Sequence, residues 1–87
     1  MATVSIPLLL QDVTGEAREA TVDGATIGEL VDALDSRFPG LKGQIARDGT
    51  PVTTITFTVD GRIASLGLAT PVPPGARVGI LPTFGGG

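Results

Sequence analysis

Hydrophobic and polar residues alternate at the start of the chain, over residues 3–10. Four apolar residues fall on the same side of this stretch: Val4, Ile6, Leu8 and Leu10. This period of two is typical of a strand with one buried face. Pro7 lies on the opposite side and has no N–H to donate, so we expect a bulge there. A turn over residues 11–16 and a weaker strand over 17–22 complete a predicted hairpin.

The apolar spacing then changes from two to three and four, which predicts a helix from Thr26 to Phe38. Thr26 and Glu29 have the spacing of a capping box. In that motif the hydroxyl accepts from the third helical N–H, and the glutamate accepts from the N–H of the capping residue. The predicted buried face consists of Ile27, Leu30, Val31, Leu34 and Phe38. Burying each such side chain contributes roughly 1.5–3 kcal/mol, so this helix is expected to be the sheet's main partner.

The second half of the chain predicts short strands separated by loops. Leu41 and Ile45 indicate one helical turn at the edge of the domain, and residues 47–51 a loop. Residues 53–59 give the clearest predicted strand, in which β-branched residues dominate and alternate side chains face inward. Asp60-Gly61 is the signal of a two-residue hairpin turn, whose central positions both need positive φ.

A short return strand is expected at residues 62–64, irregular structure at 65–75 and the final strand at 76–82. Because the first and last strands cannot be joined by a hairpin, they would pair in parallel at the centre of the sheet. The sequence therefore predicts an α+β fold, a ubiquitin-like β-grasp with a mixed sheet and one packed helix. It divides into a domain over 1–82 and a flexible glycine tail over 83–87.

Composition excludes several kinds of chemistry. The 87 residues contain no cysteine and no histidine, which removes thiol nucleophiles, serine–histidine catalysis and the commonest zinc ligands. We therefore expect no metal site and no cofactor bound by the chain itself. The net charge is −3 and the six basic residues stand singly, so neither nucleic acid nor membrane is an expected partner. No signal peptide or spanning segment is expected, and the chain is interpreted as cytoplasmic.

The end of the chain is the candidate reactive segment. Pro82 closes the last predicted strand, and Gly85-Gly86-Gly87 ends the chain. Glycine leaves the backbone slender, so an enzyme could close tightly around it, and the tail extends at most about 17 Å. The α-carboxylate of Gly87 is the candidate reacting group. The alternative is an incidental glycine-rich terminus.

Residues 67–87 resemble the sulfur-carrier family that includes ThiS, MoaD and CysO, which are β-grasp relatives of ubiquitin. The similar segments are Gly67-Leu68-Ala69-Thr70-Pro71-Val72 and Pro74-Gly75-Ala76-Arg77-Val78-Gly79-Ile80-Leu81-Pro82. The family then has three variable residues, here Thr83, Phe84 and Gly85, before a terminal diglycine at Gly86-Gly87. A looser match extends through Thr26-Ile27-Gly28-Glu29-Leu30 and Val59-Asp60-Gly61.

The resemblance implies that partner proteins perform the catalysis. A ubiquitin-activating-type enzyme would adenylate Gly87 with ATP, and sulfide or a persulfide would displace AMP to leave a thiocarboxylate. A second, sulfur-accepting biosynthetic enzyme would then take the sulfur, so the chain itself is not an enzyme. Thr83, Gly85 and Pro82 would bind the partners as parts of the tail.

Three further residues are candidates for partner contact. Phe84 is an apolar ring beside the tail, and its alternative role is to fold back onto the sheet. Arg62 and Arg77 would pair with an acidic rim on a partner, and their alternative role is as solvated surface.

The pathway and the class of protein have alternatives. Chain length and the opening Val4-Ser5-Ile6-Pro7 favour a CysO-like carrier, serving cysteine or thio-metabolite synthesis, over a ThiS-like one. Three alternative functions remain. They are a MoaD-like small subunit of molybdopterin synthase, a ubiquitin-like protein modifier, which forms isopeptide bonds to lysines, and a non-reacting interaction module.

Overall fold

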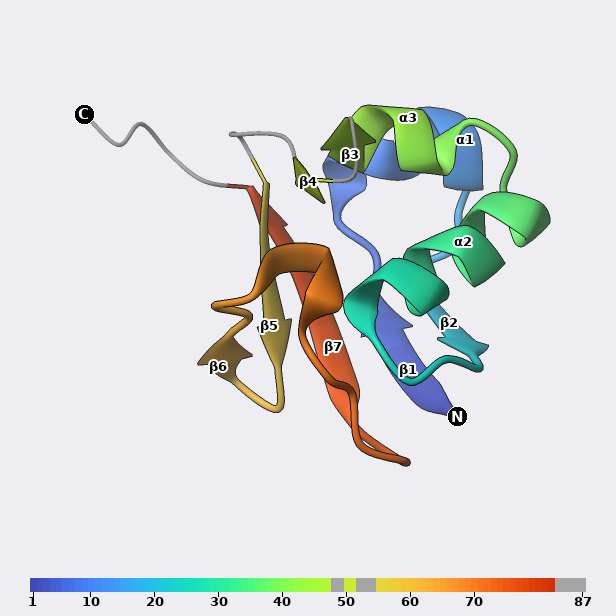
Figure 1. Cartoon of the computed structure of the whole chain (residues 1–87). Coiled ribbons are helices and arrows are strands. Elements are labelled where there is room, and N and C mark those ends of the chain that lie inside the picture. Colours follow the sequence, from blue (N-terminus) through green and yellow to red (C-terminus); the bar gives the residue numbers. More distant parts are fainter. Residues whose placement is uncertain (48–49, 52–54, 83–87) are drawn as a thin grey trace.

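A five-stranded mixed sheet forms the body of the protein (Figure 1). The computed structural model describes residues 1–47, 50–51 and 55–82. The sheet has the strand order β2-β1-β7-β5-β6. Its strands are β1 (Ala2–Ser5), β2 (Glu19–Val22), β5 (Ile55–Val59), β6 (Arg62–Ile63) and β7 (Arg77–Pro82). In the part of the chain that the structure describes, no helix is long and apolar enough to cross a membrane.

The central pair of strands is parallel, as the sequence predicts. β1 lies beside β7 with Thr3 opposite Arg77 and Ser5 opposite Gly79. Every other pair in this sheet is antiparallel. The predicted β-grasp is therefore confirmed, with the first and last strands side by side at its centre.

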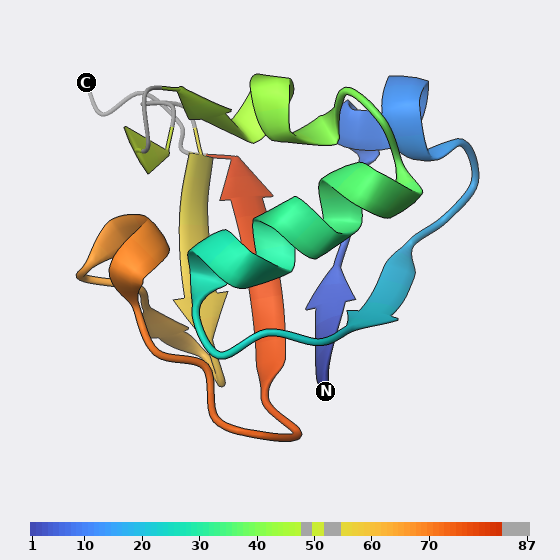
Figure 2. The ribbon, with the colours of Figure 1, turned by 45° about the vertical axis from the view of Figure 1, so that its right-hand side comes forward.

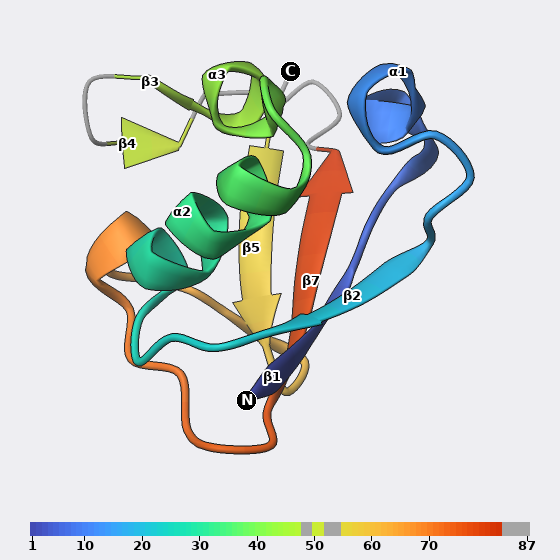
Figure 3. The same ribbon diagram turned by 90° about the vertical axis from the view of Figure 1, so that its right-hand side faces the viewer.

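Helix α2 (Ile27–Arg37) crosses one face of this sheet (Figures 2 and 3). Four residues of its predicted apolar face are buried: Ile27, Leu30, Val31 and Leu34. Phe38, the fifth, caps the end of the helix and is half-buried against the core. The helix and the inward side chains of the strands, such as Val78 and Ile80, enclose an almost wholly aliphatic core.

The N-terminus of α2 is capped nearly as predicted. The Thr26 hydroxyl accepts from the Glu29 N–H at 3.2 Å. The Glu29 carboxylate, however, accepts from the N–H of Ala25 at 3.0 Å, one residue before the expected donor. Thr26 forms a bridge to Pro71, so the backbone of the capping residue already lies against the 70–72 loop.

The N-terminal strand is shorter than predicted. β1 ends at Ser5, and Pro7 opens a 3₁₀ helix, η1 (Leu8–Leu10), which leads directly into α1 (Gln11–Thr14). The predicted bulge at Pro7 and the predicted turn over 11–16 are therefore wrong. Because Pro7 offers no N–H to a neighbouring strand, the ladder stops before it and the chain coils instead.

Residues 41–51 also differ from expectation. α3 (Leu41–Ile45) is the predicted helical turn, but Leu41 and Ile45 are fully buried and belong to the core rather than to an edge. The predicted loop contains a two-stranded ladder, β3 (Ala46–Arg47) with β4 (Thr50–Pro51).

The remaining elements agree closely with the sequence patterns. Residues 53–54 of the predicted strand lie outside the described residues, and β5 accounts for the rest. Asp60 and Gly61 both have positive φ, at 49° and 84°, which confirms the hairpin turn. Within the predicted irregular stretch, η2 (Gly67–Ala69) forms one 3₁₀ turn.

Candidate functional site

The final strand delivers the chain to one end of the sheet. β7 pairs with β5 from Val78 onward, and Pro82 lies opposite Ile55 in the last position of that ladder. Ile80 is buried in the core, whereas Leu81 is half exposed and Pro82 is exposed. The last described residue, Pro82, therefore lies at the surface, directly before the tail that the sequence predicts over 83–87.

The other predicted tail residues lie outside the described residues. These are Thr83, Phe84, Gly85, Gly86 and Gly87. Their roles stay predictions, as does the flexible tail over 83–87. Chain length alone still sets a limit, because five residues beyond Pro82 span at most about 17 Å. A partner that reacts with the terminal carboxylate must come within that distance of Pro82.

Arg77 lies at the beginning of β7, at the far end from Pro82. The strand rises ~3.3 Å per residue, which separates the two positions by about 17 Å. The Arg77 guanidinium approaches the Glu19 carboxylate at 3.6 Å, and both side chains are well exposed. The Arg77 N–H donates to the Asp60 carboxylate at 2.9 Å, which ties the start of β7 to the hairpin turn.

Arg62 follows that same turn as the first residue of β6, opposite Val59. Its side chain is exposed, and no ion pair to it is found among the described residues. The structure thus places Arg62 and Arg77 at one end of the sheet and Pro82 at the other. The three described candidates do not form a single cluster.

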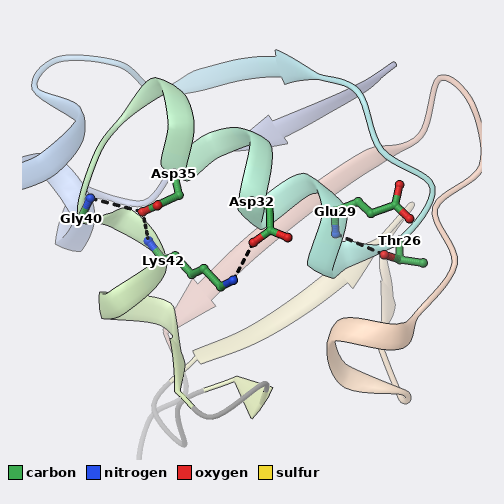
Figure 4. A network of polar contacts seen from close by, with 6 residues as sticks. All are labelled: Thr26, Glu29, Asp32, Asp35, Gly40 and Lys42. Atoms are coloured by element: carbon green, nitrogen blue, oxygen red, sulfur yellow. Dashed lines mark hydrogen bonds and ion pairs between the residues drawn. The ribbon is translucent and has the colours of Figure 1, made fainter.

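One polar network was not anticipated from the sequence (Figure 4). An Asp35 carboxylate oxygen accepts from the N–H groups of Gly40 and Lys42, at 3.2 and 3.0 Å. The Lys42 ammonium donates to the Asp32 carboxylate at 2.6 Å. This hydrogen bond, with the charge of Asp32, raises the pKa of Lys42 above 10.5. The network joins α2 to α3.

The sequence held a weak signal for this network. Pro39-Gly40 marks the end of α2, and a carboxylate one turn before such a break can accept from the freed N–H groups that follow. The arrangement is structural, since its carboxylates and its ammonium are paired with one another and with the backbone. Lys42 is nevertheless the single lysine of the sequence, which bears on conjugation chemistry.

The described residues contain no cluster of three or more side chains that could hold a metal ion. They also contain no buried side-chain polar atom without a hydrogen bond. A body of this kind, a β-grasp whose last central strand ends exposed, defines the ubiquitin-like class.

The comparisons with known proteins narrow that class to a family. The ThiS family model matches residues 10–87, and the chain therefore belongs to the ThiS family. The sulfur carrier protein CysO of Mycobacterium tuberculosis is 31% identical over 91 residues, covering 98% of this chain and 97% of that protein. Small archaeal modifier protein 3 of Haloferax volcanii is 31% identical over 67 residues, covering 75% of this chain and 73% of that protein.

Solved structures agree with this assignment. A chain of the Amycolatopsis orientalis BexX/CysO complex superposes with a TM-score of 0.91 at 31% identity, with all of both chains covered. The crystal structure of Mycobacterium tuberculosis CysO gives a TM-score of 0.88 at 27% identity, covering 97% of this chain and all of that one. The predicted resemblance to the sulfur-carrier family is confirmed.

Proposed function

We propose that this protein is a sulfur carrier of the CysO-like kind, and that its Gly87 carboxylate is the group that carries the sulfur. The observation that supports this most directly is positional. In a chain of the ThiS family, Gly86-Gly87 follows Pro82, the exposed last residue of the central strand, after three intervening residues.

The chemistry needs activation, because a carboxylate is a poor electrophile at neutral pH. The Gly87 carboxylate attacks the α-phosphorus of ATP on an adenylating partner, and pyrophosphate leaves. Sulfide then attacks the acyl carbon, and AMP leaves. Where the donor is a persulfide, its terminal sulfur first forms an acyl disulfide as AMP leaves, and a second thiol of the partner attacks the donor's sulfur, so that a disulfide forms on the partner and the carrier's sulfur is released. The product is a thiocarboxylate, whose sulfur is a nucleophile that a biosynthetic partner can direct at its substrate.

The chain's own contribution is to present the terminus without competing nucleophiles. It has no cysteine thiol and no histidine that would capture the acyl adenylate. Its single lysine, Lys42, is held as an ammonium by Asp32, and an ammonium does not attack an acyl group. A reactive terminus therefore meets few internal acceptors before it reaches a partner.

The test is intact-mass analysis of the full chain, expressed together with the activating enzyme encoded in the source organism. A fraction of the chain should be heavier by the difference between one sulfur and one oxygen atom. Deleting Gly86 and Gly87 should remove that species and sulfur transfer together. If transfer persists in the deletion variant and no heavier species forms, the proposal is rejected.

A second function is favoured by one comparison. A relative that covers three quarters of this chain is a small archaeal modifier protein, so conjugation to lysines of other proteins stays a candidate. Denaturing gels of a native lysate, probed for this chain, separate the two functions. Covalent higher-mass forms that depend on Gly87 would indicate a modifier, whereas a carrier should migrate only at its own mass.

A further inference from the structure

The 87 residues carry two primary amines, which are the side chain of Lys42 and the α-amine of Met1. An activated acyl group reacts with a free amine to give a stable amide. Each amine therefore competes with sulfide, and with every partner, for the activated carboxylate of Gly87. The fold treats the two amines differently.

The Met1 amine lies at the end of the sheet opposite to Pro82. β1 runs parallel to β7 with Thr3 opposite Arg77. The Met1 carbonyl accepts from the Gly75 N–H at 2.8 Å, before β7 begins. From Arg77 to Pro82 the strand extends about 17 Å, and Met1 lies about 7 Å further back. Five residues beyond Pro82 span at most about 17 Å, so the terminus cannot reach the α-amine of its own chain.

Lys42, in contrast, lies at the same end of the sheet as Pro82. It belongs to α3, which lies at the end where β7 finishes (Figures 1 and 2). Its neighbours Leu41 and Ile45 are buried in the same core cluster as Ile80 of β7. Distance therefore does not protect the Lys42 amine from the terminus as it protects the α-amine.

Two carboxylates of α2 hold Lys42 in place instead. The Lys42 ammonium donates to the Asp32 carboxylate at 2.6 Å, so the side chain runs from α3 onto α2 (Figure 4). The Lys42 N–H donates to the Asp35 carboxylate at 3.0 Å, which fixes the backbone from which that side chain starts. Asp32 and Asp35 are three residues apart and thus neighbours on the helix surface. The hydrogen bond and the charge of Asp32 also raise the pKa of Lys42, so that less of the amine is the nucleophilic free base.

Resting on the proposed activation of Gly87, we infer that Asp32 is a positioning residue that keeps Lys42 from capturing the activated terminus, while the parallel pairing of β1 and β7 keeps Met1 out of reach. The reaction that Asp32 suppresses is intramolecular. The neutral Lys42 amine attacks the acyl carbon of Gly87, and the activating group leaves with the bonding electron pair. The nitrogen then loses one proton to water, and an isopeptide bond closes a ring. With both amines withheld, the acyl group is transferred to a partner.

The experiment uses the full chain with Gly87 prepared as a thioester by intein cleavage, which activates the carboxylate without a partner enzyme. In mildly alkaline buffer, Asp32→Asn should form about twofold to fivefold more ring product than the wild type, as loss of an exposed ion pair implies. The ring product is lighter than the hydrolysed chain by one water, and peptide mapping should join Gly87 to Lys42. Equal yields in the two chains, including none in either, or a ring joined to Met1, would overturn the inference.

Two control variants identify the groups that react. Asp12→Asn is the matched control for the loss of a carboxylate, because Asp12 is exposed on α1 and Lys42 pairs with Asp32 instead. It should form no more ring product than the wild type. Lys42→Arg, added to Asp32→Asn, should abolish the ring product. Melting temperatures should stay close to that of the wild type, since the Lys42–Asp32 pair is exposed.

Two added lysines test the reach of the terminus. Leu81→Lys places an amine directly before Pro82, on an exposed position of β7, and should make the ring the main product. Asp23→Lys places an amine beside Met1, at a side chain that is 87% exposed, and should give no ring joined to the new lysine. A ring joined at position 23, or none in the Leu81→Lys chain, would contradict protection by distance.

The thioester separates failure of this inference from failure of the proposed function. It needs neither an activating enzyme nor sulfide, so the yields of ring product decide the role of Asp32 even if the chain is never adenylated. Conversely, a thiocarboxylate formed with the activating enzyme, together with equal ring yields from the wild type and Asp32→Asn, would refute the role of Asp32 and leave the sulfur carrier intact.

Discussion

At one end of the sheet β7 finishes at Pro82, near α3 and the β3–β4 ladder; at the other it begins at Arg77, beside the Asp60-Gly61 turn (Figure 1). The first end presents a strand terminus, and chemistry is proposed to occur beyond it. The second end is fixed by two positive-φ residues and by the Asp60–Arg77 hydrogen bond. The two ends of β7 therefore differ in kind: one is the exposed end of a strand, and the other is held by a turn.

The largest expected difference between the ends is functional. Gly86→Ala should nearly abolish thiocarboxylate formation, because an added methyl widens the chain where a partner must enclose bare backbone. Arg77→Ala should leave it within a few-fold of wild type. Intact-mass analysis of both variants, each expressed with the activating enzyme, measures the fraction of the chain that carries the thiocarboxylate.

The same pair of variants also tests the packing of each end. Neither should shift the melting temperature by much, since Gly86 has no side chain to bury and Arg77 is exposed. A large fall in the Gly86→Ala variant would contradict a terminus that acts outside the core.

The next largest effect is a loss of stability, expected for a substitution in the middle of β7, between its two ends. A Cβ on Gly79 would lie 2.5 Å from the Thr58 hydroxyl oxygen. Gly79→Ala should therefore destabilise the protein by about 1–3 kcal/mol, as overpacking does. Urea denaturation measures the change in unfolding free energy.

The matched rescue is Thr58→Ala in the Gly79→Ala background. Removing the hydroxyl leaves the Thr58 Cβ, 3.9 Å away, as the nearest atom of that side chain, so most of the loss should be recovered. Equal destabilisation with and without Thr58→Ala would show that the contact is not the cause.

At the Arg77 end, Gly61→Ala should destabilise the hairpin turn by about 1–2 kcal/mol. Gly61 has φ of 84°, and a residue with a Cβ is strained in that region. Gly61→Asn is the control, because asparagine tolerates positive φ and should cost less. Thermal unfolding ranks the three proteins, and equal losses for alanine and asparagine would argue against backbone strain.

The ion pairs of the two ends differ in geometry. Arg77→Ala should lower the unfolding free energy by less than about 1 kcal/mol, since its pair with Glu19 is exposed at 3.6 Å. A double-mutant cycle with Glu19→Gln isolates the coupling, which should vanish in high salt. Coupling that survives high salt would contradict this assignment.

Near the Pro82 end, the tighter Lys42–Asp32 pair should be visible as a titration. The pKa of Lys42 is raised above 10.5 by Asp32, so the pair's stabilisation is present below pH 10.5 and is lost as pH rises through the folded-state pKa. NMR follows the only lysine in the chain, and Asp32→Asn should return its pKa toward 10.5. An identical pKa in the variant would contradict the pairing.

Sequence patterns predicted the elements whose signals are local. Thr26, the apolar face of α2 and the Asp60-Gly61 turn were each located to within a residue. The patterns failed at residues 8–10, where the spacing of the apolar residues fits a strand although the chain forms a 3₁₀ helix. Leu8 and Leu10 fit a strand period, yet Leu8 is exposed and Leu10 buried, because the chain coils after Pro7.

The candidate site was predictable only in part. The spacing from Pro82 to the diglycine is a property of adjacent residues, and the structure bears out the strand end on which it depends. Arg62 and Arg77 were also singled out; the predicted strand over 76–82 already separates Arg77 from Pro82, but no local pattern indicated that Arg62 lies at the Arg77 end. The position of Arg62 follows from the register of β5 with β6 and β7.

The sequence by itself determined the helix and its cap, the hairpin turn, the aliphatic core and the exposed end of the last strand. Each depends on the conformational preferences and periodicity of neighbouring residues. Tertiary structure alone decided that α3 joins the core, and that Ile63, Leu66 and residues of the 70–73 loop line one groove. Those features arise from pairing between residues far apart in the chain, which no local pattern encodes.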